Sequence, residues 1–167
     1  MTDADSTTAT SDGVPGLAPL ELRYLVLAAQ REGNRALGRR LEPFGLTSSQ
    51  FEIVLVLAEY GPITLKELGE LIVCELGSPS RIVDTLVRRG FVERSTHASD
   101  RRAVALQLTV AGKALVPQLR EIERSTDERA RAELDHADLT GLANALRQYL
   151  DGSEYGQVLD RRFGAGR

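Results

Sequence analysis

The spacing of apolar residues changes at Gly90, and this change limits the folds that the chain can adopt. Upstream of Gly90, apolar residues recur every three or four positions, as they do along one face of a helix. Downstream, Val104, Leu106 and Leu108 alternate with Ala103, Ala105 and Gln107, which predicts a short strand at 103–108. A partner strand is predicted at 91–95, joined to the first by a polar turn. We therefore expect a mainly α-helical chain with one small β-hairpin.

Two capping boxes begin the first two helices of the central part of the chain. Thr47 is followed three residues later by Gln50, and Thr64 is followed in the same way by Glu67. In this arrangement the threonine hydroxyl accepts a hydrogen bond from the first helical turn, and the Gln or Glu side chain accepts one from the threonine amide. Both threonines are therefore expected to be N-caps.

A third helix is expected from Ser78 to Arg89. Serine is a favoured N-cap, and Pro79 suits the first helical position. Cations in the last turn and Gly90 just beyond it are typical of a helix C-terminus. Because Pro79 imposes a late start, we expect the preceding helix, which begins after Thr64, to be extended.

Longer helices flank this central part, at 17–41, from Thr109 to about 134, and at 139–150. Between Leu20 and Ala29 the first of them is apolar nearly all round, so it is expected to be buried on more than one side. In a chain of this size the simplest second partner is another copy of the same helix. We therefore expect a homodimer.

The charge of the chain is unevenly distributed. Its net charge is −3, which at first sight argues against a nucleic-acid partner. The segment from Ser78 to Arg102, however, holds six arginines and only three acidic residues. A basic segment on an otherwise acidic chain is the asymmetry that needs a functional explanation.

The third helix offers such an explanation. Ser78, Arg81, Thr85 and Arg88 fall within about 80° of one another on the side opposite its apolar residues. Arginine can bind guanine through two hydrogen bonds in the major groove of DNA, threonine can contact a base edge, and a helix N-terminus favours phosphate. The simpler interpretation is a solvated helix face, because amphipathic helices with two arginines are common.

The predicted hairpin favours the DNA interpretation. Its turn holds Asp100, Arg101 and Arg102 directly after the third helix. A narrow minor groove attracts inserted arginine because its electrostatic potential is more negative. A helix flanked by an arginine-tipped hairpin can contact adjacent grooves of a duplex.

Several phrases of the sequence together resemble one protein family. The most specific is an Asp-Arg-Arg turn followed, beyond the strand, by Leu-Thr-x-x-Gly. The phrases are Leu46-Thr47-Ser48-Ser49-Gln50, Gly61-Pro62-Ile63-Thr64-Leu65-Lys66-Glu67-Leu68, Ile82-Val83-Asp84-Thr85-Leu86, Arg89-Gly90-Phe91-Val92-Glu93-Arg94 and Asp100-Arg101-Arg102 with 103–112. They resemble the MarR family of winged-helix regulators, closely over 41–115 and in helix arrangement outside it.

The resemblance implies a winged helix-turn-helix fold with flanking dimerisation helices, and a transcriptional regulator, most simply a repressor, that binds a pseudo-palindromic site in double-stranded DNA. Arg101 or Arg102 of the wing would reach the minor groove, while Asp100 would orient one of them rather than touch DNA. A small aromatic or anionic effector would release the DNA, and no cofactor is implied. The implied DNA-binding residues of the recognition helix are Ser78, Ser80, Arg81, Thr85 and Arg88.

The expected domain organisation follows the same scheme. It consists of a disordered arm at 1–16, a dimerisation helix at 17–45, the winged helix-turn-helix domain at 46–115, C-terminal dimerisation helices at 116–152 and a loosely ordered tail at 153–167.

Two other functions were weighed against DNA binding. A winged-helix module that binds protein and not DNA is left open by the acidic remainder of the chain. An enzyme is not expected, since the sequence has no nucleophile elbow, phosphate loop or nucleotide-binding motif. The isolated His97 and His136 are weak evidence for a metal site, so none is expected.

Location and redox chemistry follow from a few further features. No run of eighteen uncharged apolar residues is present, and 1–16 lack the apolar centre of a signal peptide, so we expect a cytoplasmic protein. The one cysteine, Cys74, excludes a disulfide within the chain. Its neighbours supply no cation to stabilise a thiolate, so a small buried hydrophobe is expected, with an oxidant-sensing thiol as the alternative.

Overall fold

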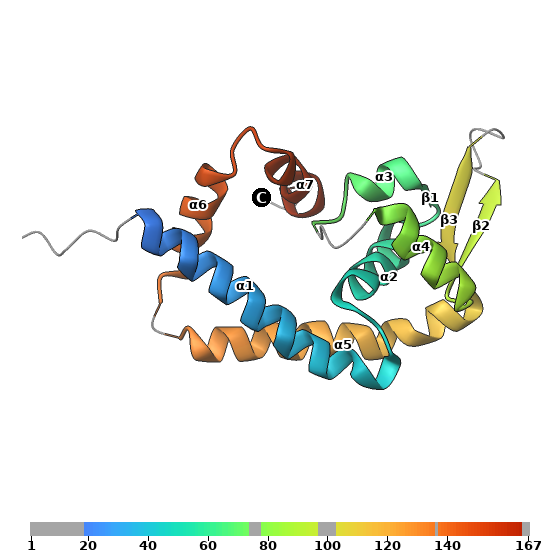
Figure 1. Ribbon diagram of the computed structural model, residues 1–167, viewed down its shortest axis with the longest axis horizontal. Coiled ribbons are helices and arrows are strands. Elements are labelled where there is room, and N and C mark those ends of the chain that lie inside the picture. Colours follow the sequence, from blue (N-terminus) through green and yellow to red (C-terminus); the bar gives the residue numbers. More distant parts are fainter. Residues whose placement is uncertain (1–18, 74–77, 97–102, 136, 165–167) are drawn as a thin grey trace, which may run out of the picture. The chain divides into compact units, whose positions relative to one another are not determined.

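The computed structural model describes residues 19–73, 78–96, 103–135 and 137–164 (Figure 1). Over these residues the chain is mainly α-helical, with one small antiparallel sheet, which confirms the expected fold class. The described residues fall into two compact units that divide between Arg35 and Ala36. The first unit is the N-terminal part of α1 (Pro19–Leu41), and the second contains every later element.

Both predicted capping boxes are present. At the start of α2 (Ser48–Tyr60), the amide of Gln50 donates to Thr47 Oγ1 at 3.2 Å, and the amide of Thr47 donates to Gln50 Oε1 at 3.0 Å. Thr64 and Glu67 exchange the same pair of bonds at the start of α3 (Leu65–Gly69). Because each box satisfies backbone donors that the first turn leaves unpaired, it fixes where its helix begins.

The predicted extension of α3 is wrong, because the helix ends at Gly69. The amide of Glu70 still donates to the carbonyl of Lys66 at 3.2 Å, but the chain then turns and Ile72 enters the core. The amide of Val73 donates to the Glu52 carboxylate on α2 at 3.0 Å and not to a helical carbonyl. A side chain from another helix therefore captures the donor that a longer α3 would have needed.

The next helix, α4 (Pro79–Arg88), begins where the sequence predicts, with Ser78 at the N-cap position. The Ser78 side chain does not cap the helix; its Oγ lies 2.8 Å from Ser80 Oγ instead. At the other end Gly90 adopts φ +74°, a left-handed conformation that favours glycine, and its amide donates to the carbonyl of Val87. This turn directs the chain from α4 into the sheet.

The sheet has the strand order β1-β3-β2, with all neighbours antiparallel. The predicted hairpin is formed by β2 (Val92–Thr96) and β3 (Val104–Leu108). The third strand, β1 (Ile63–Thr64), pairs with Leu106 and Ala105 and was not predicted from the sequence. Two residues are too few to show any alternation of apolar and polar side chains.

Burial along β3 does not follow the apolar alternation of its sequence at every position. Leu106 and Leu108 are buried, but Val104 is 54% exposed and Ala105 is buried instead. Val104 pairs with Thr96 at the far end of the hairpin, beyond the two residues of β3 that β1 covers. The hairpin therefore projects away from the core at this end.

A single apolar cluster holds the central elements together. α2 supplies the largest share of it, while α4 contributes Val83 and Leu86 and α5 (Val110–Glu133) contributes Leu119 and Ile122. Val83 and Leu86 have no exposed surface, so they anchor one side of α4 in the core. The opposite face of α4 is left for other contacts.

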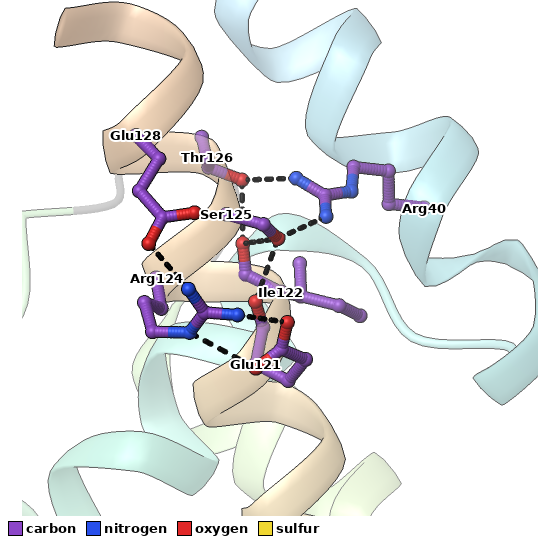
Figure 2. A network of polar contacts seen from close by, with 7 residues as sticks. All are labelled: Arg40, Glu121, Ile122, Arg124, Ser125, Thr126 and Glu128. Carbon is purple, nitrogen blue, oxygen red and sulfur yellow. Dashed lines mark hydrogen bonds and ion pairs between the residues drawn. The ribbon is translucent and has the colours of Figure 1, made fainter.

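A polar network ties the end of α1 to the middle of α5 (Figure 2). Arg40 donates to Thr126 Oγ1 at 2.7 Å and to Ser125 Oγ. The two hydroxyls donate in turn to backbone carbonyls one turn earlier, Thr126 to Ile122 and Ser125 to Glu121, each at 2.6 Å. The network joins two helices that are distant in sequence within the second unit.

Next to this network, Arg124 pairs with two carboxylates of its own helix. It donates to Glu121 at 2.6 Å and also to Glu128. The hydrogen bond from Arg124 lowers the pKa of Glu121 from its ordinary value, and the same contacts raise the pKa of Arg124. Arg124 thus forms ion pairs with residues one turn before and one turn after it on α5.

The expected loosely ordered tail at 153–167 is wrong over the residues that the structure describes. After α6 (Leu139–Tyr149), Ser153 caps a further helix, α7 (Glu154–Phe163). Val158 of α7 is buried, and Arg162 pairs with Glu52 of α2. Glycines in this region suggested a flexible tail, but the Ser153 cap and these tertiary contacts outweigh that composition. No helix in the described part of the chain combines the length and apolar character needed to cross a bilayer.

Candidate nucleic-acid interface

α4 presents two different faces. Val83 and Leu86 are buried in the core, whereas Arg81 and Arg88 are exposed on the other side. Thr85 is half-buried between the two arginines. The predicted polar face therefore has no buried member: Ser78, Arg81 and Arg88 are exposed and Thr85 is half-buried.

Hydrogen bonds organise the C-terminal half of this face. Thr85 Oγ1 donates to the carbonyl of Arg81 at 3.0 Å and accepts from Arg88 Nη2 at 3.0 Å. The Arg88 guanidinium is therefore held over the helix surface next to Thr85. A held guanidinium has less conformational entropy to lose when it binds a partner.

Arg81 differs from its neighbours, because its guanidinium has no hydrogen-bond or ion-pair partner among the described residues. One turn earlier, Ser78 and Ser80 are linked through their hydroxyls at 2.8 Å. These two serines and Arg81 together present hydroxyls and one free cation at the N-terminal end of α4. This end of a helix also favours anions through its unpaired amides.

An ion pair that is not evident from the sequence joins α4 to the hairpin. Arg94 Nη2 on β2 lies 2.6 Å from Asp84 Oδ1 on α4, and both side chains are about half exposed. The residues are ten positions apart in different elements, so only the fold brings them together. The acidic residue on the exposed side of α4 thus serves to orient the hairpin strand.

Arg89 is exposed, but its guanidinium is engaged in contacts within the fold. It donates to the carbonyl of Gly45 at 2.6 Å and to that of Phe44 at 2.8 Å. Its guanidinium also lies over the ring of Phe91, 4.9 Å from the centroid. Of the two adjacent arginines that end α4, only Arg88 is left to face a ligand.

Some of the predicted residues lie outside the residues that the structure describes. These are Asp100, Arg101 and Arg102 of the wing turn, together with Cys74, His97 and His136. Their predicted roles stay predictions. Within the described ranges, no cluster of three His, Cys, Asp or Glu side chains is arranged to hold a metal ion.

Comparison with known proteins identifies the family. The MarR family model matches residues 46–104. The multiple antibiotic resistance protein MarR of Escherichia coli is 31% identical over 113 residues, which cover 68% of this chain and 77% of that protein. The transcriptional repressor NicR of Pseudomonas putida is 29% identical over 65% of this chain and 69% of its own length.

A solved structure agrees with these sequence matches. A cysteine-to-serine mutant of E. coli MarR in complex with operator DNA superposes with a TM-score of 0.68 and 27% identity, covering 77% of this chain and 93% of that one. The family and fold expected from the sequence are thereby confirmed. The chain belongs to the MarR family of winged-helix transcriptional regulators.

Proposed function

We propose that this protein is a homodimeric transcriptional repressor that binds a pseudo-palindromic operator with α4 in the major groove. The observation that carries the proposal is the division of α4 between a face fixed in the core and a face that presents Arg81, Thr85 and Arg88. A rigid helix with exposed arginine and hydroxyl groups matches the hydrogen-bonding groups on base edges and phosphates. That a relative was solved with operator DNA supports the same assignment.

The surroundings of each polar residue on the exposed side of α4 suggest which part of the DNA it contacts. Arg81, which has no partner among the described residues, is proposed to bind a guanine through O6 and N7. Thr85 would contact a base edge, and Arg88, held by Thr85, would bind a base or a phosphate. Ser78 and Ser80, at the helix N-terminus, would hydrogen-bond phosphate oxygens.

The wing is proposed to contact the neighbouring minor groove through Arg101 or Arg102, with Asp100 orienting one of them. The support comes from the hairpin strands, which flank this turn, and from the Asp84–Arg94 ion pair, which orients β2 on α4. An arginine carried at the end of such a hairpin gains from the more negative potential of a narrow groove. A carboxylate close to phosphates is repelled, so Asp100 is assigned the orienting role.

Dimerisation is proposed to use the outer helices. On α1, five large apolar side chains are exposed: Leu20, Leu22, Tyr24, Leu25 and Val26. A second copy covering them would remove apolar surface from water, which is the usual driving force for obligate dimers. Two recognition helices about 34–36 Å apart then meet successive major grooves of one operator.

Regulation and location complete the proposal. Binding of a small aromatic or anionic effector would release the operator, and the protein would act on chromosomal DNA in the cytoplasm as a regulator, without enzymatic activity. An effector shifts this equilibrium only if it prefers the conformation that does not bind DNA. Thermal-shift screening of small aromatic acids, followed by operator release, would identify it.

The function is tested by selecting duplex fragments of the source genome with the purified full-length protein and titrating the selected duplex in increasing salt. The proposal predicts that one pseudo-palindromic sequence is enriched. It also predicts that the logarithm of the binding constant falls linearly with the logarithm of the salt concentration. Each neutralised phosphate contributes about −0.9 to the slope of log binding constant against log salt concentration. Arg101→Ala or Arg102→Ala should therefore reduce the magnitude of this slope by roughly one. Absence of any enriched duplex would favour the alternative of a winged-helix module that binds protein.

A further inference from the structure

The C-terminal helix α7 is joined to α2 by an ion pair between two nearly buried side chains. Arg162 Nη1 lies 2.7 Å from Glu52 Oε1, and the two side chains are only 16% and 15% exposed. The Arg162 guanidinium also lies over the ring of Phe163, 5.2 Å from its centroid. One turn earlier on α7, Val158 is 3% exposed. These contacts give α7 a defined position on the winged-helix part of the chain.

Glu52 has a second partner, on the segment that leads to the recognition helix. The same oxygen, Oε1, accepts a hydrogen bond from the backbone amide of Val73 at 3.0 Å. Val73 lies beyond the end of α3 and is the last described residue before Ser78, the N-cap of α4. One carboxylate oxygen therefore binds both the C-terminal helix and the chain that enters α4.

We propose that α7 sets the position of α4 through the contacts Arg162–Glu52–Val73, which makes Arg162 a positioning residue for DNA binding. The inference rests on the proposed function, because it assigns α4 to the major groove. A carboxylate as little exposed as Glu52 needs a cationic partner, since an unpaired charge in a poorly solvated site is costly. Without Arg162, the Glu52 carboxylate turns toward water, and its bond to the amide of Val73 weakens.

The consequence for DNA binding is a change in population. When the amide of Val73 no longer binds Glu52, Val73 is no longer held against α2, and only the fraction of molecules with α4 correctly placed binds the operator. The apparent dissociation constant rises in proportion as that fraction falls. A fall of the competent fraction to about one tenth weakens binding about tenfold.

The adjacent arginine of α7 provides a matched control. Arg161 Nη1 lies 3.0 Å from Glu70 Oε2, but both side chains are nearly half exposed. Ion pairs at this exposure contribute little to stability. Arg161→Ala removes the same charge from the same helix as Arg162→Ala, so any general electrostatic effect on DNA binding is equal in the two variants.

The test measures operator affinity by fluorescence anisotropy and amide hydrogen exchange at Val73 in the full-length protein. Arg162→Ala should weaken operator binding about tenfold, lower the protection of the Val73 amide by a similar factor and leave the salt slope unchanged. Arg161→Ala should stay within about twofold of wild type. Arg162→Lys, which keeps the charge but not the planar fork, should recover most of the affinity.

Glu52→Gln separates the two bonds of Glu52. The glutamine oxygen can still accept from Val73, but the side chain no longer carries a charge that needs Arg162. In this background, Arg162→Ala should change affinity less than about threefold. This variant also keeps the test decisive if Arg162→Ala alone does not fold.

Each contrary result has a distinct meaning. Wild-type affinity or unchanged Val73 protection in Arg162→Ala would overturn the inference, and a salt slope reduced by about one would show that Arg162 contacts phosphate directly. A wild-type protein that binds no duplex would overturn the proposed function, while the exchange measurement would still test the contacts between α7 and Val73.

Discussion

Asp84 on α4 and Arg94 on β2 form an ion pair of 2.6 Å that joins α4 to the hairpin. Both side chains are about half exposed, so the pair contributes little to the free energy of unfolding. Its effect is geometric, because it fixes the relative orientation of two elements that are proposed to contact adjacent grooves. Orientation of this kind lowers the entropy lost on binding.

Breaking this pair should therefore affect DNA binding more than stability. Arg94→Ala and Asp84→Ala should each lower the free energy of unfolding by less than about 1 kcal/mol. A double-mutant cycle on operator affinity should give a coupling energy of about 0.5–1 kcal/mol between the two positions. The measurements are urea denaturation and anisotropy titration of the four proteins. Strictly additive effects on affinity would show that the pair does not orient the wing.

Arg88 and Arg89 are adjacent in sequence but should respond in opposite ways to substitution. Arg89→Ala removes hydrogen bonds to the carbonyls of Gly45 and Phe44, so unfolding should become easier by about 1.5–3 kcal/mol. Arg88→Ala should change stability by less than about 0.5 kcal/mol but weaken operator binding. Chemical denaturation measures the stability of both variants, and fluorescence anisotropy measures their affinity for the operator. Loss of stability in Arg88→Ala with unchanged affinity would contradict this assignment.

Gly112 is required by a close approach of two backbones. A Cβ atom at this position would lie 2.1 Å from the carbonyl oxygen of Phe91, which cannot move away because it accepts a hydrogen bond from the amide of Thr109. Gly112→Ala should therefore lower the free energy of unfolding by at least about 3 kcal/mol. Gly38→Ala is the control, since no described atom lies within 4 Å of the added methyl group and alanine favours a helix by about 0.5–1 kcal/mol. Equal melting temperatures for the two variants would contradict the clash.

Much of the fold could be predicted from local signals in the sequence. The boxes at Thr47 and Thr64, the proline start of α4 and the glycine end at Gly90 each depend on residues within one helical turn, so pattern alone located them. Gly112 was noticed only as part of a family phrase. Its physical reason, contact with Phe91, needs the folded chain.

The features that the sequence did not reveal depend on distant partners. β1 exists because Ile63 meets Leu106 across the sheet, and α3 stops early because Glu52 captures the amide of Val73. α7 was missed because its stabilising partner, Glu52, lies 110 residues away in the sequence. Within the candidate site, the polar face of α4 followed from helical periodicity, whereas its link to the hairpin through Arg94 did not.

The exposed apolar residues of α1 predict an obligate dimer. Sedimentation equilibrium at micromolar concentration should give twice the 18.2 kDa of one chain. Replacing Leu25, which is 52% exposed, by glutamate should shift the population toward monomer, since a carboxylate would be buried without a partner. Val110→Glu is the control, because Val110 is 87% exposed on the first turn of α5. A monomeric wild type would rule out binding to a pseudo-palindrome by two copies.

The central claim is that α4 selects DNA sequence through Arg81, and competition binding of Arg81→Ala tests it most directly. Wild type, Arg81→Ala and the charge-matched control Arg124→Ala on α5 would each be titrated with the selected operator and its single-base variants. We predict that Arg81→Ala loses about 1–3 kcal/mol at the operator and its preference at one base pair, while Arg124→Ala keeps both. A loss shared equally by all variants would make Arg81 a phosphate contact, and an unchanged affinity would contradict the assignment of this face of α4 to DNA.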